Sequence, residues 1–171
     1  DCPLHTPDTI RELADMRARS NAAVVVLTMK LDDPFGYGRI IRDGEGRVER
    51  IVEQKDANAA EAAVTECNSG FYCFDAQALF EALEQVGSDN AQGEFYLTDV
   101  LEICRGTGRD VLALPASDVS ECLGVNSRVQ LAAATCALQS RINKEHMAAG
   151  VTMWDPASVW IGPDVEIAPD V

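Results

Sequence analysis

Two short segments carry the residue types best suited to holding a ligand: LDDPFGYGRI at residues 31–40 and IVEQKD at residues 51–56. Gly36 and Gly38 lack a Cβ atom, so the backbone there can adopt unusual dihedral angles or lie against a flat ligand. Glu53 follows in the returning strand of a predicted hairpin, where its carboxylate can accept hydrogen bonds from sugar hydroxyl groups. A surface hairpin with a tight turn explains the same residues equally well, so both interpretations stay open.

A six-residue repeat ends the chain: VWIGPD at residues 159–164 is followed by VEIAPD at residues 165–170 and then by Val171. This period, with a small residue after each isoleucine, is typical of a parallel β-helix, although a chance likeness between two loops is the alternative. About three repeats are needed to bury a solenoid core. We therefore expect residues 151–171 to be only the start of a β-helix.

The composition of the chain argues against several classes of protein. A net charge of −14 argues against nucleic-acid binding, although a metal ion can screen the phosphates of a nucleotide substrate. No apolar run reaches the roughly 18 residues of a membrane span. None of the six cysteines has CxxC spacing, so zinc and thioredoxin-type sites are not expected. There is no initiator Met and no secretion signal, and we interpret the sequence as an internal piece of a longer cytoplasmic protein with free thiols.

Periodicity and capping residues predict alternating helices and strands. Thr6, Asp75 and Ser127 are placed to cap helices, and residues 43–46 form the turn of the hairpin. The alternation predicts an α/β fold with a mostly parallel, three-layer sheet into which the antiparallel hairpin is inserted. The expected helices lie at about residues 7–19, 76–86, 94–105 and 128–149, and the expected strands at residues 22–27, 70–74 and 111–114.

Ligands in such sheets bind beyond the carboxyl ends of the strands. Asp1, Asn68 and Asn126 all lie near predicted strand ends or in the loops that follow them. Without further information, three candidate residues also have ordinary structural roles available: Asp1 in a turn before a helix, Asn126 as an N-cap next to Ser127, and Glu53 as a solvated strand residue.

The motifs, taken in order, resemble the bacterial family of bifunctional N-acetylglucosamine-1-phosphate uridyltransferase / glucosamine-1-phosphate acetyltransferase (GlmU) enzymes. The resemblance covers essentially the whole chain, and its most specific parts are the two longest motifs. The motifs are DxPL at residues 1–4, LDDPxGYGRI at residues 31–40, IVExKD at residues 51–56, NxG at residues 68–70, NAQGExYLTD at residues 90–99 and GVN at residues 124–126.

The resemblance implies a Rossmann-like nucleotidyltransferase domain that is truncated at its N-terminal side and leads into a left-handed β-helix. On this basis residues 1–126 would be a partial nucleotidyltransferase domain, 127–150 a connecting helix and 151–171 the start of the β-helix. The family's uridyltransferase half joins UTP and N-acetylglucosamine-1-phosphate into UDP-N-acetylglucosamine and pyrophosphate with Mg²⁺. Its acetyltransferase half uses acetyl-CoA and works as a homotrimer.

The same resemblance assigns roles to five residues. Asp1 and Asn126 would ligate Mg²⁺, a hard cation that is often held by one or two side chains. Gly38 would let the backbone approach the sugar nucleotide, and Glu53 and Asn68 would hydrogen-bond its N-acetylglucosamine part. No residue is expected to act as a nucleophile, because an oxygen of the sugar phosphate attacks UTP directly and catalysis is mainly positioning and charge neutralisation.

The family's glycine-rich loop, triphosphate-binding cations and uracil-binding segment all precede the position of Asp1. We therefore expect little or no uridyltransferase turnover from this chain alone, and no acetyltransferase activity. We also expect an unpaired strand edge where the first strands of the sheet would lie.

Two other functions stay open. The first is another sugar-1-phosphate nucleotidyltransferase, one that makes UDP-glucose or dTDP-glucose. The second is a non-catalytic module that binds a sugar nucleotide or drives assembly.

Overall fold

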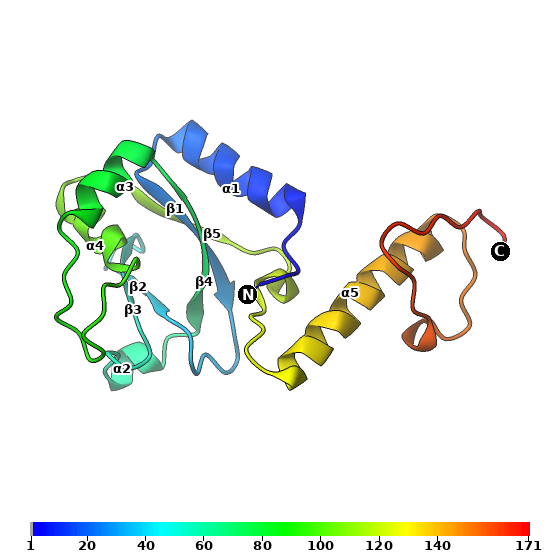
Figure 1. Cartoon of the computed structure of the whole chain (residues 1–171). Coiled ribbons are helices and arrows are strands. Elements are labelled where there is room, and N and C mark those ends of the chain that lie inside the picture. The colour runs from blue at the N-terminus through cyan, green and yellow to red at the C-terminus, as the bar shows by residue number, and fades with distance from the viewer. Residues whose placement is uncertain (1) are drawn as a thin grey trace. The chain divides into compact units, whose positions relative to one another are not determined.

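A computed structural model describes residues 2–171, which fall into two units (Figure 1). The larger unit spans His5–Val119, and the smaller unit combines the N-terminal residues through Leu4 with Ser120–Val171. None of the helices within residues 2–171 combines the length and apolar character that are needed to span a bilayer.

The larger unit is built on a five-stranded mixed sheet with the order β3-β2-β4-β1-β5. β1 and β5 are parallel, whereas β4 runs antiparallel to both β1 and β2, and β2 and β3 form the predicted hairpin. The strands are β1 (Val24–Lys30), β2 (Arg39–Arg42), β3 (Val48–Val52), β4 (Glu66–Phe74) and β5 (Val111–Pro115).

The prediction of a mostly parallel sheet is therefore wrong. It treated the hairpin as an insertion between core strands that run parallel to each other. Instead, the hairpin starts near the end of β1 and returns the chain to that same end, so Glu66 of β4 pairs with Lys30 of β1. β4 then runs back along β1 in the opposite direction.

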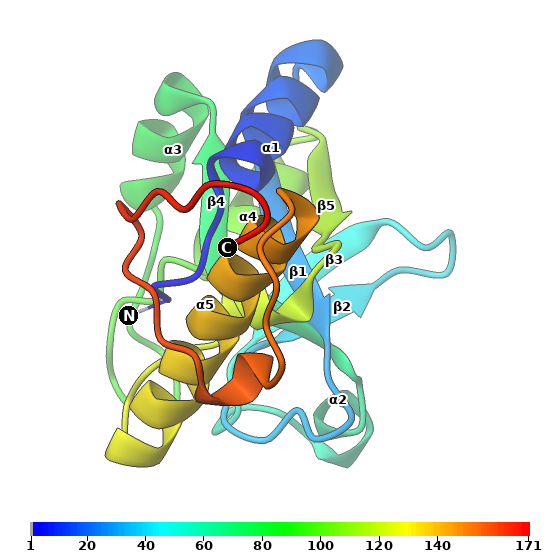
Figure 2. The ribbon, with the colours of Figure 1, turned by 90° about the vertical axis from the view of Figure 1, so that its right-hand side faces the viewer.

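Helices cover both faces of this sheet, as predicted. α1 (Pro7–Ser20) packs on β1 and β4, and α4 (Asp99–Gly106) packs on the opposite side with α3 (Ala76–Leu83), as Figures 1 and 2 show. The buried core between the sheet and the α3–α4 layer includes Val24, Val26, Ile40, Ile51 and Leu101. β1 is buried along nearly its whole length because helices lie on both of its faces.

The predicted caps are present, but two helices differ in extent. Thr6 and Asp75 each accept a hydrogen bond from the backbone of the first turn that follows. α3 ends at Leu83 rather than near residue 86, and α4 begins at Asp99 rather than at 94. The residues before α4 form turns instead, in which Gly93 has a φ of +68° and the Asn90 side chain accepts from the Gln92 and Glu94 amides.

β4 pairs with β2 at a single position, Arg39 with Cys67. The rest of that edge of β4, toward Phe74, has no β partner among the described residues. This agrees with the expectation of an unpaired strand edge. A short helix that the sequence did not predict, α2 (Ala59–Ala62), lies between β3 and β4 and begins with a capping box formed by Asn58 and Glu61.

The smaller unit contains the long predicted helix α5 (Arg128–Ala148), capped by Ser127. The side-chain amides of Gln139 and Asn143 donate to carbonyl oxygens of the segment after the helix, including that of Val159, at 2.6 and 2.8 Å. Residues 151–171 therefore pack back on α5 as turns and a short 3₁₀ helix, η2 (Pro156–Ser158).

No strand and no β-helix occur in residues 151–171, which corrects the prediction for this segment. The physical reason is that a β-helix strand needs strands of neighbouring coils as hydrogen-bond partners, and two repeats provide none. The segment does close on itself: Asp170 N–H donates to Gly150 O and Thr152 N–H donates to Val171 O, both at 3.0 Å.

Candidate functional site

The open end of the β2–β3 hairpin brings Gly38 close to Glu53. The last residue pair of the β2–β3 ladder is Arg39 with Val52, so Gly38 and Glu53 are the next residues beyond it on each strand. A Cβ atom on Gly38 would lie 3.0 Å from Ile51 Cγ2 and 3.3 and 3.4 Å from the two Glu53 carboxylate oxygens. Any larger residue at position 38 would therefore displace this carboxylate or the Ile51 side chain.

Asn68 joins this pair from the neighbouring strand β4. Its backbone N–H donates to Gly38 O at 2.8 Å. Its side-chain Nδ2 donates to the Tyr72 hydroxyl at 2.7 Å, and its Oδ1 accepts from the Gly70 N–H at 2.9 Å. These bonds set the orientation of the carboxamide and leave one N–H and one lone pair for a ligand.

The Glu53 carboxylate is half-buried and lies in an acidic neighbourhood. Burial raises the pKa of Glu53, and the negative charges of Asp56 and Asp99 raise it further. A hydrogen bond from the Thr98 hydroxyl to Glu53 Oε1, at 3.3 Å, and the positive charge of Arg39 act in the opposite direction. Carboxylates with raised pKa values are common at ligand-binding and catalytic sites.

Tyr72 and Thr98 belong to this cluster, and sequence reasoning gave neither of them a role. Burial raises the pKa of Tyr72 to about 12, so its phenol is neutral and its O–H remains available as a donor. Thr98 is buried at the start of α4. The signal for Tyr72 was its even spacing from Asn68 along one strand, which puts both residues on the same face. Thr98 carried no comparable local signal, because the bond that ties it to Glu53 spans 45 residues.

Asn126 lies in the smaller unit, in the exposed loop before α5. Its backbone N–H donates to Gln130 Oε1 at 2.8 Å, so the first turn of the helix holds the loop in place. Its carboxamide makes no hydrogen bond within residues 2–171, and an amide oxygen of this kind is a suitable Mg²⁺ ligand. Asp1 lies outside the described residues.

Comparisons with known proteins place the chain in a family. A family profile described as "Nucleotidyl transferase" matches residues 6–154. The chain belongs to the nucleotidyl transferase family. It is 55% identical over 170 residues to a protein named "Bifunctional protein GlmU" from Lactobacillus helveticus, covering 99% of this chain and 37% of that protein. It is also 50% identical over 171 residues to a protein of the same name from Streptococcus thermophilus, covering 100% of this chain and 37% of that protein.

A solved structure shares the fold of this nucleotidyl transferase chain. It is a putative glucose-1-phosphate thymidylyltransferase from Bacillus anthracis in complex with a sucrose. The TM-score is 0.53 at 18% identity, over 86% of this chain and 52% of the other. This likeness concerns the fold alone. The resemblance inferred from the motifs is confirmed, and the chain spans a little more than a third of the length of the curated relatives named here.

Within this nucleotidyl transferase fold, the structure brings together three of the five predicted site residues: Gly38, Glu53 and Asn68. Asn126 belongs to the other unit, and Asp1 is not described. The described residues contain no group of three or more His, Cys, Asp or Glu side chains placed to hold a metal ion. A Mg²⁺ site of one or two protein ligands completed by phosphate oxygens and water does not require such a group.

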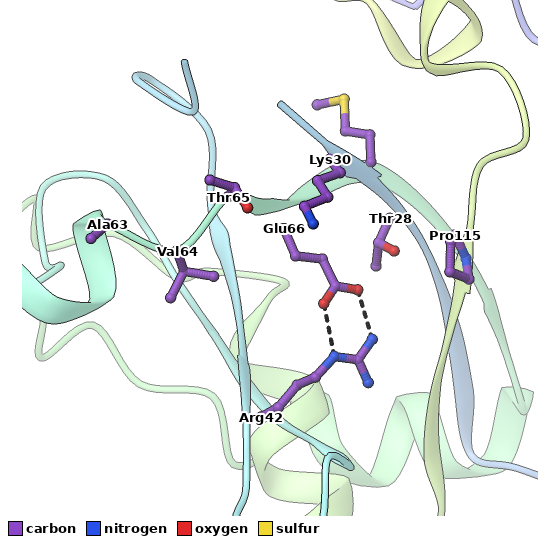
Figure 3. Close-up of a pocket in the computed structure, with 9 residues that line it drawn as sticks. Thr28, Lys30, Arg42, Ala63, Val64, Thr65, Glu66 and Pro115 are labelled. Atoms are coloured by element: carbon purple, nitrogen blue, oxygen red, sulfur yellow. Dashed lines mark hydrogen bonds and ion pairs between the residues drawn. The ribbon is translucent and has the colours of Figure 1, made fainter. Parts of the chain in front are cut away.

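A separate cavity of about 550 Å³ lies beyond the end of β1 and contains none of the predicted site residues (Figure 3). Arg42 donates to both carboxylate oxygens of Glu66, at 2.7 and 2.6 Å. Burial alone would raise the pKa of Glu66, but the hydrogen bonds and charge of Arg42, together with smaller contributions from Thr28 and Lys30, outweigh it and the pKa is lowered. Since its carboxylate is already paired, we interpret this cluster as a joint between β2 and β4.

Proposed function

We propose that this chain forms the sugar-binding part of a nucleotidyltransferase that makes UDP-N-acetylglucosamine and pyrophosphate from UTP and N-acetylglucosamine-1-phosphate. One observation carries the proposal: Gly38, which the motifs single out together with Glu53 and Asn68, accepts a hydrogen bond from the Asn68 backbone and lies directly beside the Glu53 carboxylate in a nucleotidyltransferase fold. The identity to proteins named GlmU supports the same function.

The three residues offer complementary groups to a sugar. The Glu53 carboxylate is an acceptor for hydroxyl hydrogens, and the free N–H of Asn68 is a donor for a hydroxyl or acetamido oxygen. Gly38 leaves the carboxylate uncovered on the side where a Cβ atom would otherwise stand. A neutral Tyr72 keeps the Asn68 amide group turned so that its second N–H is available.

In the proposed reaction, an oxygen of the sugar phosphate forms a bond to the α-phosphorus of UTP while the bond to pyrophosphate breaks. No protein nucleophile is needed, and the chain contributes mainly by positioning the sugar. Asn126 and Asp1 would hold Mg²⁺, which supplies neutralisation of phosphate charge when it is bound. The acetyl-CoA-dependent activity and the homotrimer implied by the family resemblance would depend on a β-helix.

The smaller unit is consistent with such a β-helix at its start. The backbone bonds that join Gly150 to Asp170 and Thr152 to Val171 close one loop over residues 150–171. We propose that this loop becomes the first coil when further repeats stack on it.

Two alternatives make different predictions for binding. A nucleotidyltransferase for another sugar-1-phosphate would prefer UDP-glucose or dTDP-glucose, and the fold shared with the Bacillus anthracis structure is compatible with it. A non-catalytic assembly module would bind no nucleotide in a metal-dependent way.

The test is calorimetric titration of UDP-N-acetylglucosamine into the chain, with and without Mg²⁺, with UDP-glucose as the competing ligand. We expect Glu53→Ala to weaken binding in both conditions and Asn126→Ala to remove only the dependence on Mg²⁺. Glu45→Ala, at the exposed turn of the same hairpin, is the matched control. Tighter binding of UDP-glucose than of UDP-N-acetylglucosamine would favour the first alternative, and binding that Glu53→Ala leaves unchanged would contradict the proposed site.

A further inference from the structure

Arg39, the first residue of β2, is a buried cation without a carboxylate partner. It is the largest fully buried side chain of the described residues, with 2% of its surface exposed. It forms no ion pair with any carboxylate in the described part of the chain. A buried charge is costly unless it is compensated, so its hydrogen bonds should account for its presence.

Those hydrogen bonds connect the two strands of the hairpin at its open end. The guanidinium donates to the backbone oxygen of Tyr37, just before β2, and to Gln54 Oε1, just after β3, the latter at 2.7 Å. A longer bond, at 3.5 Å, reaches the Ala62 oxygen of α2. The same Gln54 oxygen accepts from the Gly36 N–H at 3.0 Å. The Arg39–Gln54 contact therefore fixes the residues on either side of Gly38 relative to the residue after Glu53.

This link begins where the ladder of backbone hydrogen bonds stops. The last β2–β3 pair is Arg39 with Val52, so no ladder bond sets Gly38 opposite Glu53. Successive residues of a strand point to opposite faces, which puts Arg39 on the face of the sheet opposite the Glu53 carboxylate. The guanidinium thus supports the sugar-binding residues from behind without occupying their space.

We propose that Arg39 is a positioning residue that, together with Gln54, holds Gly38 and Glu53 in register for the sugar nucleotide. The Nε of Arg39 is buried without a hydrogen-bond partner among the described residues. The inference rests on the proposed function for its ligand, but the geometry that it concerns can be measured without one.

The experiment compares Arg39→Met, Gln54→Leu and the double variant with Arg47→Met, which makes the same chemical change at the exposed end of the hairpin. The double variant replaces both partners of the Arg39–Gln54 hydrogen bond by apolar groups, which pack against each other better than methionine packs against a polar amide, so it should recover part of the urea midpoint that Arg39→Met loses. We expect the double variant still to bind UDP-N-acetylglucosamine about tenfold more weakly than the unmodified chain. Arg47→Met should bind normally.

If the affinity recovers together with the urea midpoint, Arg39 has only a structural role and the inference is overturned. If Arg39→Met does not fold, Gln54→Leu alone decides, because it breaks the contact between the two sides of the hairpin while Arg39 still donates to the Tyr37 oxygen. If the unmodified chain binds no sugar nucleotide, the proposed function fails while hydrogen exchange still tests the positioning. We then expect faster exchange at the Asn68 amide, which donates to the Gly38 oxygen, in Gln54→Leu than in Arg47→Met, and equal exchange would overturn the inference.

Discussion

The two ends of the β2–β3 hairpin each hold a carboxylate, and the environments of these two carboxylates are opposite. At the turn, the Asp43 carboxylate accepts hydrogen bonds from the backbone of Glu45 at 3.0 Å and of Arg47 at 2.9 Å, and from the Arg47 side chain at 3.0 Å. Arg105 of α4 also donates to it. These bonds, led by the Arg47 backbone N–H, lower the pKa of Asp43 to about 2.

At the open end, the Glu53 carboxylate has the opposite electrostatic character. Within residues 2–171 it has one protein donor, Thr98, and burial together with nearby acidic residues raises its pKa. The fold therefore stabilises the charged form at the turn and disfavours it at the open end. The difference suggests that the turn is organised for stability, whereas the open end retains hydrogen-bonding capacity for a ligand.

The largest expected effect comes from comparing one glycine at each end. In Gly38→Ala the new Cβ atom would lie 3.0 Å from Ile51 Cγ2 and 3.3 Å from the Glu53 carboxylate, so one of them must move. We expect affinity for UDP-N-acetylglucosamine to fall by about tenfold or more, roughly 1.4 kcal/mol, as measured by calorimetry.

Gly44→Ala is the control, because a Cβ atom there meets nothing within 4 Å and its φ is not positive. We expect it to leave affinity unchanged. Equal losses in both variants would show that the hairpin responds to substitution as a whole, and the distinction between its two ends would fail.

The same contrast explains which features the sequence predicts. The turn at residues 43–46 and the caps Thr6, Asp75 and Ser127 involve partners within a few residues, so residue type and spacing indicate them directly. The contact between Thr98 and Glu53 and the bond from Asn68 to Gly38 join distant positions. For Gly38, Glu53 and Asn68, only the family resemblance indicated a shared site.

Two errors in the fold have the same cause. The direction of β4 depends on how the hairpin returns the chain, and no residue of β4 specifies it locally. The repeat at residues 159–171 has the period of a β-helix, but this period leads to strands only when neighbouring coils supply hydrogen-bond partners. Local patterns predicted most helices and the strands of the sheet, whereas long-range pairing decided their arrangement.

The second-largest expected effect is on stability and comes from Asp43 at the turn of the hairpin. Because the folded-state pKa of Asp43 lies below its ordinary value of 3.8, its ionised form stabilises the fold above about pH 4, and this contribution is lost as the pH falls toward about 2. Asp43→Ala should lower the thermal unfolding midpoint by a few degrees at neutral pH and flatten its decline in acid. Scanning calorimetry across this pH range measures both effects. The control is Asp32→Ala, which changes a residue in an exposed loop.

Affinity for the sugar nucleotide should not change in Asp43→Ala at a temperature where the variant is fully folded. The turn and the open end are separated by the ladder of β2 and β3, which the substitution leaves in place. A loss of affinity as large as that of Gly38→Ala would instead mean that the turn sets the register of the open end.

The smallest expected effect on stability comes from Glu53, whose pKa is shifted in the opposite direction to that of Asp43. Since the folded-state pKa of Glu53 lies above its ordinary value, the fold favours the protonated carboxyl, and stability falls as the pH rises through that raised pKa. Glu53→Gln keeps the shape of the side chain and removes the charge. It should therefore slightly raise the unfolding midpoint at pH 7 and leave it nearly unchanged at pH 4.

The same variant should bind UDP-N-acetylglucosamine more weakly at pH 7, because a neutral amide is a poorer acceptor for hydroxyl hydrogens than a carboxylate. Glu45→Gln, at the exposed turn, should change neither the midpoint nor the affinity appreciably. If Glu53→Gln lowered the unfolding midpoint and left the affinity unchanged, the open end of the hairpin would be organised for stability and not for ligand binding. A higher midpoint with lost affinity would show that the Glu53 carboxylate is kept at this position for binding, at a cost in stability that the Asp43 turn does not incur.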